Sequence, residues 1–217
     1  LAVLFDEGKV IERDQKEAQK LWTFSCQNQV PESCISLGTM HMDPEGNQHD
    51  PRLAVTIFDT GCAHPQGATA CSLAGFAGLE ETSLKMGPEA IRSYLERGCD
   101  GGHAMGCDIL AREWVGGRFG PPDGPKVVSI LKRSCDGGFP PGCAHLGDAL
   151  RYGALGRPDG QQLQDAYRRG CDGGVSDACV SLAQLNERGE LVPVDLKKAG
   201  DAYQKACNLG VQEACKR

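Results

Sequence analysis

Apolar and small residues recur in a helical pattern along the chain. Each occurrence has four of them at positions i, i+3, i+4 and i+7, which lie on one face of an α-helix. The pattern returns at intervals of about 36 residues, a period typical of solenoids built from small repeats. The residues concerned are Ala18, Leu21, Trp22 and Ser25; Ala54, Ile57, Phe58 and Gly61; Ile91, Tyr94, Leu95 and Gly98; Val127, Ile130, Leu131 and Ser134; Leu163, Ala166, Tyr167 and Gly170; and Ala199, Ala202, Tyr203 and Ala206.

A helix start precedes each of these patterns. An aspartate side chain can accept hydrogen bonds from the free N–H groups of a first helical turn. The residues at this place are Asp14, Asp50, Asp123, Asp159 and Asp195, with Gly87 in the remaining repeat. Pro51 and Pro88 then follow at the first helical position, where the missing N–H of proline costs least. The sequence therefore predicts a capped first helix of about 13 residues in every repeat.

A second helix follows a glycine turn in each repeat. The turn is clearest as Cys-Asp-Gly-Gly at 99–102, 135–138 and 171–174, and glycine there supplies the left-handed residue that ends a helix. Beyond it a large apolar residue stands beside a small one, as in Leu146 and Gly147, which lets two helices approach closely. Repeated antiparallel helical hairpins predict an all-α fold, a right-handed α/α superhelical solenoid.

The repeat boundaries follow from the predicted caps. We expect one solenoid domain over residues 1–217, and residues 1–8 match residues 182–189, inside a repeat. Leu1, Val3, Leu4 and Phe5 are accordingly expected to pack as the end of a second helix. The expected divisions are 1–12, the remnant of a preceding repeat; 13–49, 50–86, 87–122, 123–158 and 159–194, complete repeats; and 195–217, a truncated last repeat.

Twelve cysteines form six pairs, one in each repeat. Each pair spans the turn between the two predicted helices, where the Cα separation of about 5.5 Å that suits a disulfide is easily reached. Zinc is the alternative, but zinc sites use closely spaced cysteine clusters with further ligands, and the five histidines share no repeat position. We therefore favour disulfides within repeats and expect no cofactor. The expected bridges are Cys26–Cys34, Cys62–Cys71, Cys99–Cys107, Cys135–Cys143, Cys171–Cys179 and Cys207–Cys215.

These motifs resemble a known family. Ala-Tyr-x-x-x-Cys at 166–171 and 202–207, the Cys-Asp-Gly-Gly turn and Ala-Cys-x-x-Leu-Ala at 178–183 are similar to Sel1-like repeats, relatives of the tetratricopeptide repeat. The paired cysteines resemble those of the bacterial cysteine-rich Hcp proteins and of a mitochondrial intermembrane-space assembly factor for cytochrome oxidase. The resemblance implies an adaptor, a scaffold or a peptide-binding surface. For some Hcp-type proteins it also implies penicillin binding and weak β-lactamase activity.

An enzymatic function has one supporting pattern. Ser129 and Lys132 form an S-x-x-K motif of the kind that serine β-lactamases use, but the accompanying S-D-N and K-T-G elements are absent from the sequence. The motif is expected on the polar side of a first helix, where it arises readily by chance. We therefore keep a hydrolase acting on β-lactams or peptidoglycan fragments as an alternative function only.

The charge balance narrows the class of partner. The chain has a net charge of −6 and 6% aromatic residues, which disfavours nucleic acid because phosphate binding needs a basic surface and stacking needs aromatic rings. It has no apolar run long enough to span a bilayer. Disulfides imply an oxidising compartment: the periplasm, the cell surface, the extracellular medium or, as an alternative, the mitochondrial intermembrane space.

Basic residues gather in the last turns of the first helices. Stacked from repeat to repeat they would form a basic ladder suited to an acidic peptide, although the helix dipole alone favours them there. Asp165–Arg169 and Asp201–Lys205 are expected i, i+4 pairs. Arg97 and Arg133 have serines at i−4 and should be the least neutralised. The candidate binding residues are Arg97, Lys132, Arg133, Arg168, Arg169 and Lys205.

The sequence therefore favours an exported, non-enzymatic module that binds a protein or peptide partner with an acidic segment. A protective partner of a toxin or effector in the periplasm is a further alternative.

Overall fold

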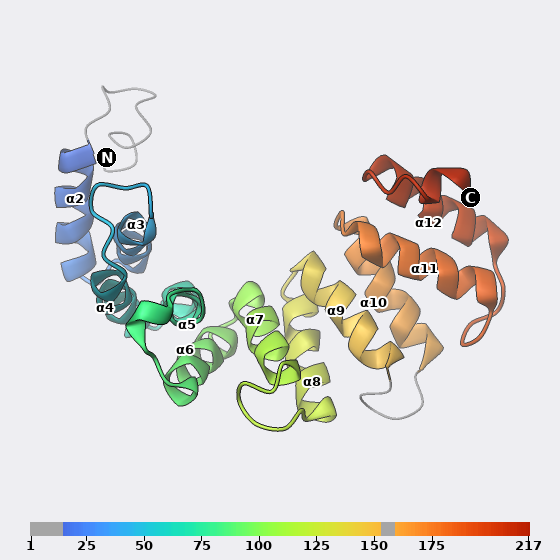
Figure 1. The fold of residues 1–217 in the computed structure, drawn as a ribbon, viewed down its shortest axis with the longest axis horizontal. Coiled ribbons are helices and arrows are strands. Elements are labelled where there is room, and N and C mark those ends of the chain that lie inside the picture. The colour runs from blue at the N-terminus through green and yellow to red at the C-terminus, as the bar shows by residue number, and fades with distance from the viewer. Residues whose placement is uncertain (1–14, 153–158) are drawn as a thin grey trace. The chain divides into compact units, whose positions relative to one another are not determined.

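The computed structural model describes residues 15–152 and 159–217. The predicted cap Asp14 and the apolar residues Leu1, Val3, Leu4 and Phe5 lie outside this part. The described residues form eleven α-helices and no strand, as the all-α prediction requires. Figure 1 shows these helices following one another as antiparallel hairpins.

Each repeat consists of a first helix, helix A, and a second one, helix B. The A helices are α2 (Gln15–Gln27), α4 (Pro51–Cys62), α6 (Pro88–Asp100), α8 (Gly124–Asp136), α10 (Gly160–Asp172) and α12 (Leu196–Asn208). The B helices are α3 (Pro31–Met42), α5 (Ala68–Glu80), α7 (Ala104–Val115), α9 (Pro140–Arg151) and α11 (Ser176–Arg188). Two 3₁₀ helices, Thr82–Leu84 and Ala214–Lys216, complete the described elements.

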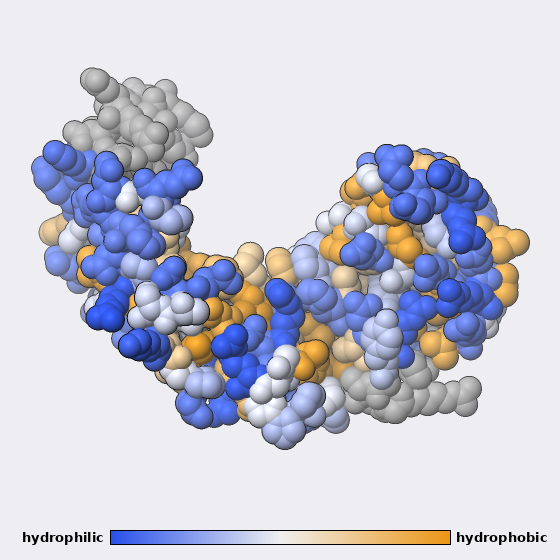
Figure 2. Space-filling model, in the orientation of Figure 1, coloured by the Kyte–Doolittle hydropathy of each residue, from blue (hydrophilic) through white to orange (hydrophobic). Residues whose placement is uncertain are grey.

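The chain forms two compact units, residues 1–106 and residues 107–217. In the first unit α2 to α6 pack in chain order, and in the second α8 to α12 do the same. Each helix therefore buries its apolar stripe against its neighbours in the sequence. On the face drawn in Figure 2, hydrophilic residues cover much of each unit, and smaller hydrophobic areas are interspersed among them.

The predicted helix starts are confirmed where the structure describes them. The carboxylate of Asp50 accepts hydrogen bonds from the backbone N–H groups of Arg52 and Leu53, and the caps Asp123, Asp159 and Asp195 accept equivalent bonds. Gly87 occupies the same place without a side-chain bond. The A helices therefore begin at the predicted caps.

The turns between helices use the left-handed conformation that the sequence predicts. Gly138 has a φ of 83° and Gly174 a φ of 88°, which L-residues with a side chain rarely adopt. In the first repeat Gln29 takes the position with a φ of 64°. One geometry thus closes helix A in repeats that differ in sequence.

Close packing between hairpins depends on the small residues of helix B. A Cβ atom at Gly147 would lie 2.5 Å from the ring of Tyr167, which is buried on α10. In the first unit a Cβ atom at Gly38 would lie 2.4 Å from the buried ring of Phe58. The predicted pairing of a large and a small residue is confirmed, because an aromatic ring of the next repeat occupies the space left by the glycine.

The cysteines form disulfides within repeats, as predicted, and the described residues contain no free cysteine. Cys99 and Cys107 are disulfide-bonded like the others. Within residues 15–152 and 159–217 no cluster of His, Cys, Asp or Glu is placed to hold a metal ion, so the zinc alternative has no support. The bridges Cys26–Cys34, Cys62–Cys71, Cys135–Cys143, Cys171–Cys179 and Cys207–Cys215 have Cα separations of 4.4 to 4.8 Å.

Candidate functional site

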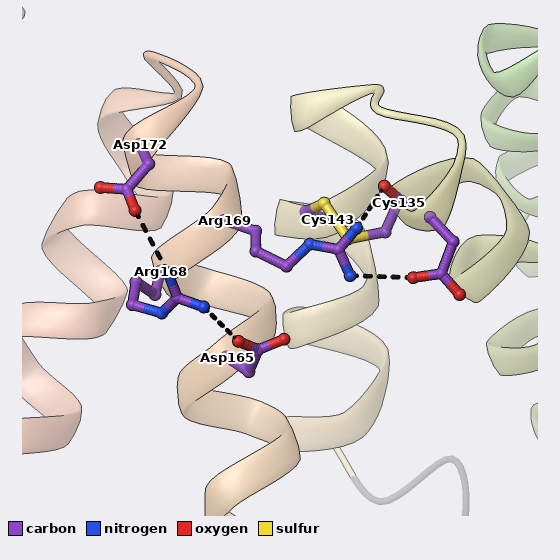
Figure 3. A network of polar contacts seen from close by, with 7 residues as sticks. Cys135, Cys143, Asp165, Arg168, Arg169 and Asp172 are labelled. Carbon is purple, nitrogen blue, oxygen red and sulfur yellow. Dashed lines mark hydrogen bonds and ion pairs between the residues drawn. A yellow bond between two sulfur atoms is a disulfide. The ribbon is translucent and has the colours of Figure 1, made fainter.

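The predicted basic ladder lies on the A helices. Arg169 of α10 extends to the C-terminal end of α8, next to the Cys135–Cys143 disulfide (Figure 3). Its guanidinium donates to the carbonyl oxygen of Cys135 (2.7 Å) and to the carboxylate of Asp136 (2.9 Å). Arg169 therefore joins two successive repeats.

Two further ladder residues, Arg97 and Lys205, make similar contacts, and we call these contacts and that of Arg169 inter-repeat clamps. In the first unit Arg97 donates to the carbonyl oxygen of Cys62 (3.2 Å) and lies 3.7 Å from the carboxylate of Asp59. Lys205 of α12 donates to Asp172 of α10. Arg133 also interacts with another group of the protein. In these three repeats the basic residue two positions before the first cysteine of the pair binds groups of the preceding repeat. These residues are Arg97, Arg169 and Lys205.

The predicted i, i+4 pairs are wrong. Arg168, not Arg169, binds Asp165, and it also lies 3.5 Å from Asp172 (Figure 3). Lys205 pairs with Asp172 instead of Asp201. Arg97 is likewise more neutralised than predicted. The reason is that the carbonyl and carboxylate at the end of the preceding A helix lie within reach, and they compete with acceptors on the same helix.

Ladder residues line two grooves between neighbouring A helices of the second unit. Lys132 and Arg169 line a groove of about 400 Å³ between α8 and α10, and Arg168 and Lys205 line one of about 430 Å³ between α10 and α12. We call this surface of the second unit, formed by α8, α10 and α12, the A face. Lys132 is exposed and forms no ion pair within the described residues.

A larger and more apolar groove lies between the B helices α7 and α9, with α8 as its floor. Its volume is about 630 Å³, and we call it the B-face groove. It is lined by Ala111, Arg112, Val115, Gly116, Pro122, Gly124, Val127, Leu131, His145, Asp148, Ala149 and Tyr152. Most of these residues are apolar or glycine, so the groove differs in chemistry from those of the A face.

A histidine and an aspartate link α7 to α9 at the B-face groove. Nδ1 of His145 lies 2.7 Å from a carboxylate oxygen of Asp108, whose side chain is 5% exposed. This hydrogen bond raises the pKa of His145 above its ordinary value of 6.5, although partial burial opposes the shift. The contact therefore favours a protonated imidazole at the wall of the groove.

A second aspartate of the groove is held by a tyrosine. The hydroxyl of Tyr167 donates to Asp148 at 2.8 Å. Burial, with Asp148 as a further cause, raises the pKa of Tyr167. Because Tyr167 also packs on Gly147, the close contact between α9 and α10 fixes one polar group of the groove.

The hydrolase motif lies on the surface of α8. Ser129 and Lys132 are both exposed. The hydrolase alternative therefore gains no support.

Sequence reasoning missed the B-face groove. Its two walls follow an i, i+3, i+4, i+7 pattern on two B helices, whereas the prediction for these helices concerns only their large and small residues. On α7 the residues of this pattern are Asp108, which binds His145, and the lining residues Ala111, Arg112 and Val115; on α9 they are His145, Asp148 and Ala149, followed by the C-cap residue Tyr152. A search for this pattern in helix B would have indicated the two walls.

Comparisons with known proteins give structural neighbours. No protein-family model matches the sequence, and no curated protein matches it. A Sel1 repeat protein from Oxalobacter formigenes has a TM-score of 0.77 and 21% identity, with 95% of this chain and 84% of that chain covered. The protective antigen c5321 of uropathogenic Escherichia coli, which displays an SLR fold, has a TM-score of 0.53 and 18% identity, covering 98% and 53%.

Helicobacter pylori cysteine rich protein B is also similar, with 26% identity, coverage of 59% of this chain and 91% of that chain, and a TM-score of 0.46.

The hairpins, the inter-repeat packing and the disulfide in each repeat define a helical-repeat protein. More specifically, the chain has the fold of the Sel1-like repeat proteins. At these identities the likeness describes the fold, and the function has to be argued from the surfaces of this chain.

Proposed function

We propose that this chain is a protein-interaction module that binds a peptide segment of a partner protein. The observation that carries the proposal is the set of grooves between adjacent repeats of the second unit, with volumes of about 400 to 630 Å³. Pockets of this size receive small ligands or a few side chains. Repeat folds commonly use such extended surfaces for binding.

The module is proposed to work in an oxidising compartment outside the cytosol. Each disulfide closes a loop of about nine residues, which the chain-entropy model values at about 2.5 kcal/mol. Bridges of this kind persist in the periplasm, at cell surfaces or in the extracellular medium, and are rare in reducing compartments. Within the described residues no helix is long and apolar enough to cross a bilayer.

The proposal is tested by selecting peptides from a random phage-displayed library on the immobilised, oxidised protein. We expect a family of related peptides to be enriched over a surface without protein. The same selection on reduced protein should fail, because the bridges hold the turns that place the helices. If the oxidised protein enriches no peptide family, the proposed function is wrong.

The A face is tested with the same peptides. Lys132 is the ladder cation without an ion pair, so Lys132→Glu should weaken any acidic peptide that binds there, and increasingly so at low ionic strength. Lys197→Glu, an exposed lysine in the first turn of α12, is the matched control. Lys197 lines neither groove of the A face, so equal affinity of the two variants excludes the groove between α8 and α10.

A further inference from the structure

The B-face groove has an apolar middle and two different ends. Val127 and Leu131 of α8 form the floor, and Ala111 and Ala149 stand on the two walls. At one end the hydrogen bond between His145 and Asp108 joins the walls. The groove is therefore closed by a polar contact on one side.

The other end exposes apolar surface. Val115 is 59% exposed and Tyr152 is 84% exposed, and both line the groove. Large aromatic side chains of this kind supply much of the binding energy at protein interfaces. A side chain placed between them would bury apolar area on both walls and on the floor.

The charges of the groove favour a carboxylate. Arg112 is exposed on α7 and forms no ion pair with any described residue. The lining anion Asp148 already accepts the hydroxyl hydrogen of Tyr167. The groups that face His145 are Asp108 and Arg112 from α7 and Asp148 from α9, while α8 contributes Gly124, Val127 and Leu131. Arg112 is thus the cation available to an incoming anion.

We propose that the B-face groove binds a peptide segment of a partner that presents an apolar side chain beside a carboxylate. The apolar side chain lies over Val127 and Leu131, between Val115 and Tyr152. The carboxylate pairs with Arg112 and accepts a hydrogen bond from the outer nitrogen of His145. This inference rests on the proposed function, since it names the site and the chemistry of the segment that the module binds.

The experiment uses the peptides enriched on the oxidised protein and measures their affinity by fluorescence anisotropy. We expect their consensus to be an aromatic or large aliphatic residue next to Asp or Glu. Val115→Asp should weaken binding about tenfold or more, because it adds a negative charge and removes apolar surface. Val194→Asp is the control, because Val194 is 57% exposed and lies outside this groove.

The charge contacts are tested separately. Arg112→Gln should lower the affinity for the peptides. Arg188→Gln should leave it unchanged, because Arg188 is exposed at the end of α11, outside the groove. Replacing the acidic residue of the peptide by its amide should remove the difference between wild type and Arg112→Gln. Affinity for the acidic peptide should fall as the pH rises through the pKa of His145, and the amide peptide should lack this dependence.

The two proposals fail in different ways. Enriched peptides that bind Val115→Asp and wild type equally would overturn the B-face site and leave the interaction module intact. A consensus with an apolar residue and no acidic one, or no loss in Arg112→Gln, would overturn the carboxylate contact. An empty selection would overturn both. Circular dichroism of the variants verifies that each is folded before its affinity is interpreted.

Discussion

The two faces of the second unit use charge in opposite ways. On the A face, Arg169 and Lys205 bind groups of the preceding repeat. On the B face, Arg112 forms no ion pair with described residues, and the groove around it is largely apolar. A row of cations on a solenoid is therefore a poor marker of a binding surface when the same cations hold the repeats together. A few polar groups around an apolar groove are a better one.

The largest expected effect is on the free energy of unfolding, and it comes from the close contact between α9 and α10. Gly147→Ala places a methyl group against the buried ring of Tyr167, so it should destabilise the fold by about 1 to 3 kcal/mol. Without this clash the same substitution would stabilise the helix, because alanine is a better helix former than glycine. Gly200→Ala is the control, because nothing lies within 4 Å of a Cβ atom there, and it should stabilise α12 by up to about 1 kcal/mol. Urea unfolding measures both, and equal effects would show that the contact is unimportant.

A smaller effect is expected from breaking a clamp. Arg169→Ala removes the hydrogen bonds to Cys135 and Asp136 and should cost about 1 kcal/mol, since the side chains are partly exposed and screened. Lys132→Ala, on the same face, should change stability by less than about 0.5 kcal/mol. Thermal unfolding measures both variants, and the melting temperature of Arg169→Ala should be the lower of the two. Equal melting temperatures would mean that the clamps do not stabilise the fold.

The smallest effect is the pH dependence of stability through His145. Its pKa is raised in the folded protein, so the contribution of its contact with Asp108 is fully present below pH 6.5 and is lost as the pH rises through the folded-state pKa. The change should stay below about 1 kcal/mol because the imidazole is partly solvated. His145→Gln should remove this part of the slope in unfolding experiments at a series of pH values. A slope unchanged by the substitution would contradict the assignment.

Local rules predict much of the fold. The cap at Asp50, the turn glycine Gly138 and the bridge between Cys135 and Cys143 each depend on residues within about one helix hairpin, and sequence spacing fixes them. The contact between Gly147 and Tyr167 is also predictable in kind, because large and small residues alternate at fixed places.

The partners of the charged residues could not be predicted in the same way. Asp136 lies 33 residues before Arg169, whereas Asp165 lies one helical turn away and is the partner that the i, i+4 rule predicts. The pairing of His145 with Asp108 spans 37 residues and links different places in two successive repeats. Such contacts depend on how one hairpin packs on the next, which spacing within a repeat does not determine.

The clamp also bears on how chains of this kind can change in length. Arg97 binds the carbonyl of Cys62 and Arg169 that of Cys135, so the joint between neighbours is built from the same two positions in both units. If a whole repeat were duplicated or lost, the basic residue of one repeat would still meet the carbonyl of the first cysteine in the repeat before it. The extra residue between Cys62 and Cys71 lies beyond the carbonyl that Arg97 binds. A turn can therefore gain a residue without loss of the clamp. The chain can likewise gain a repeat without a new kind of contact between neighbouring repeats.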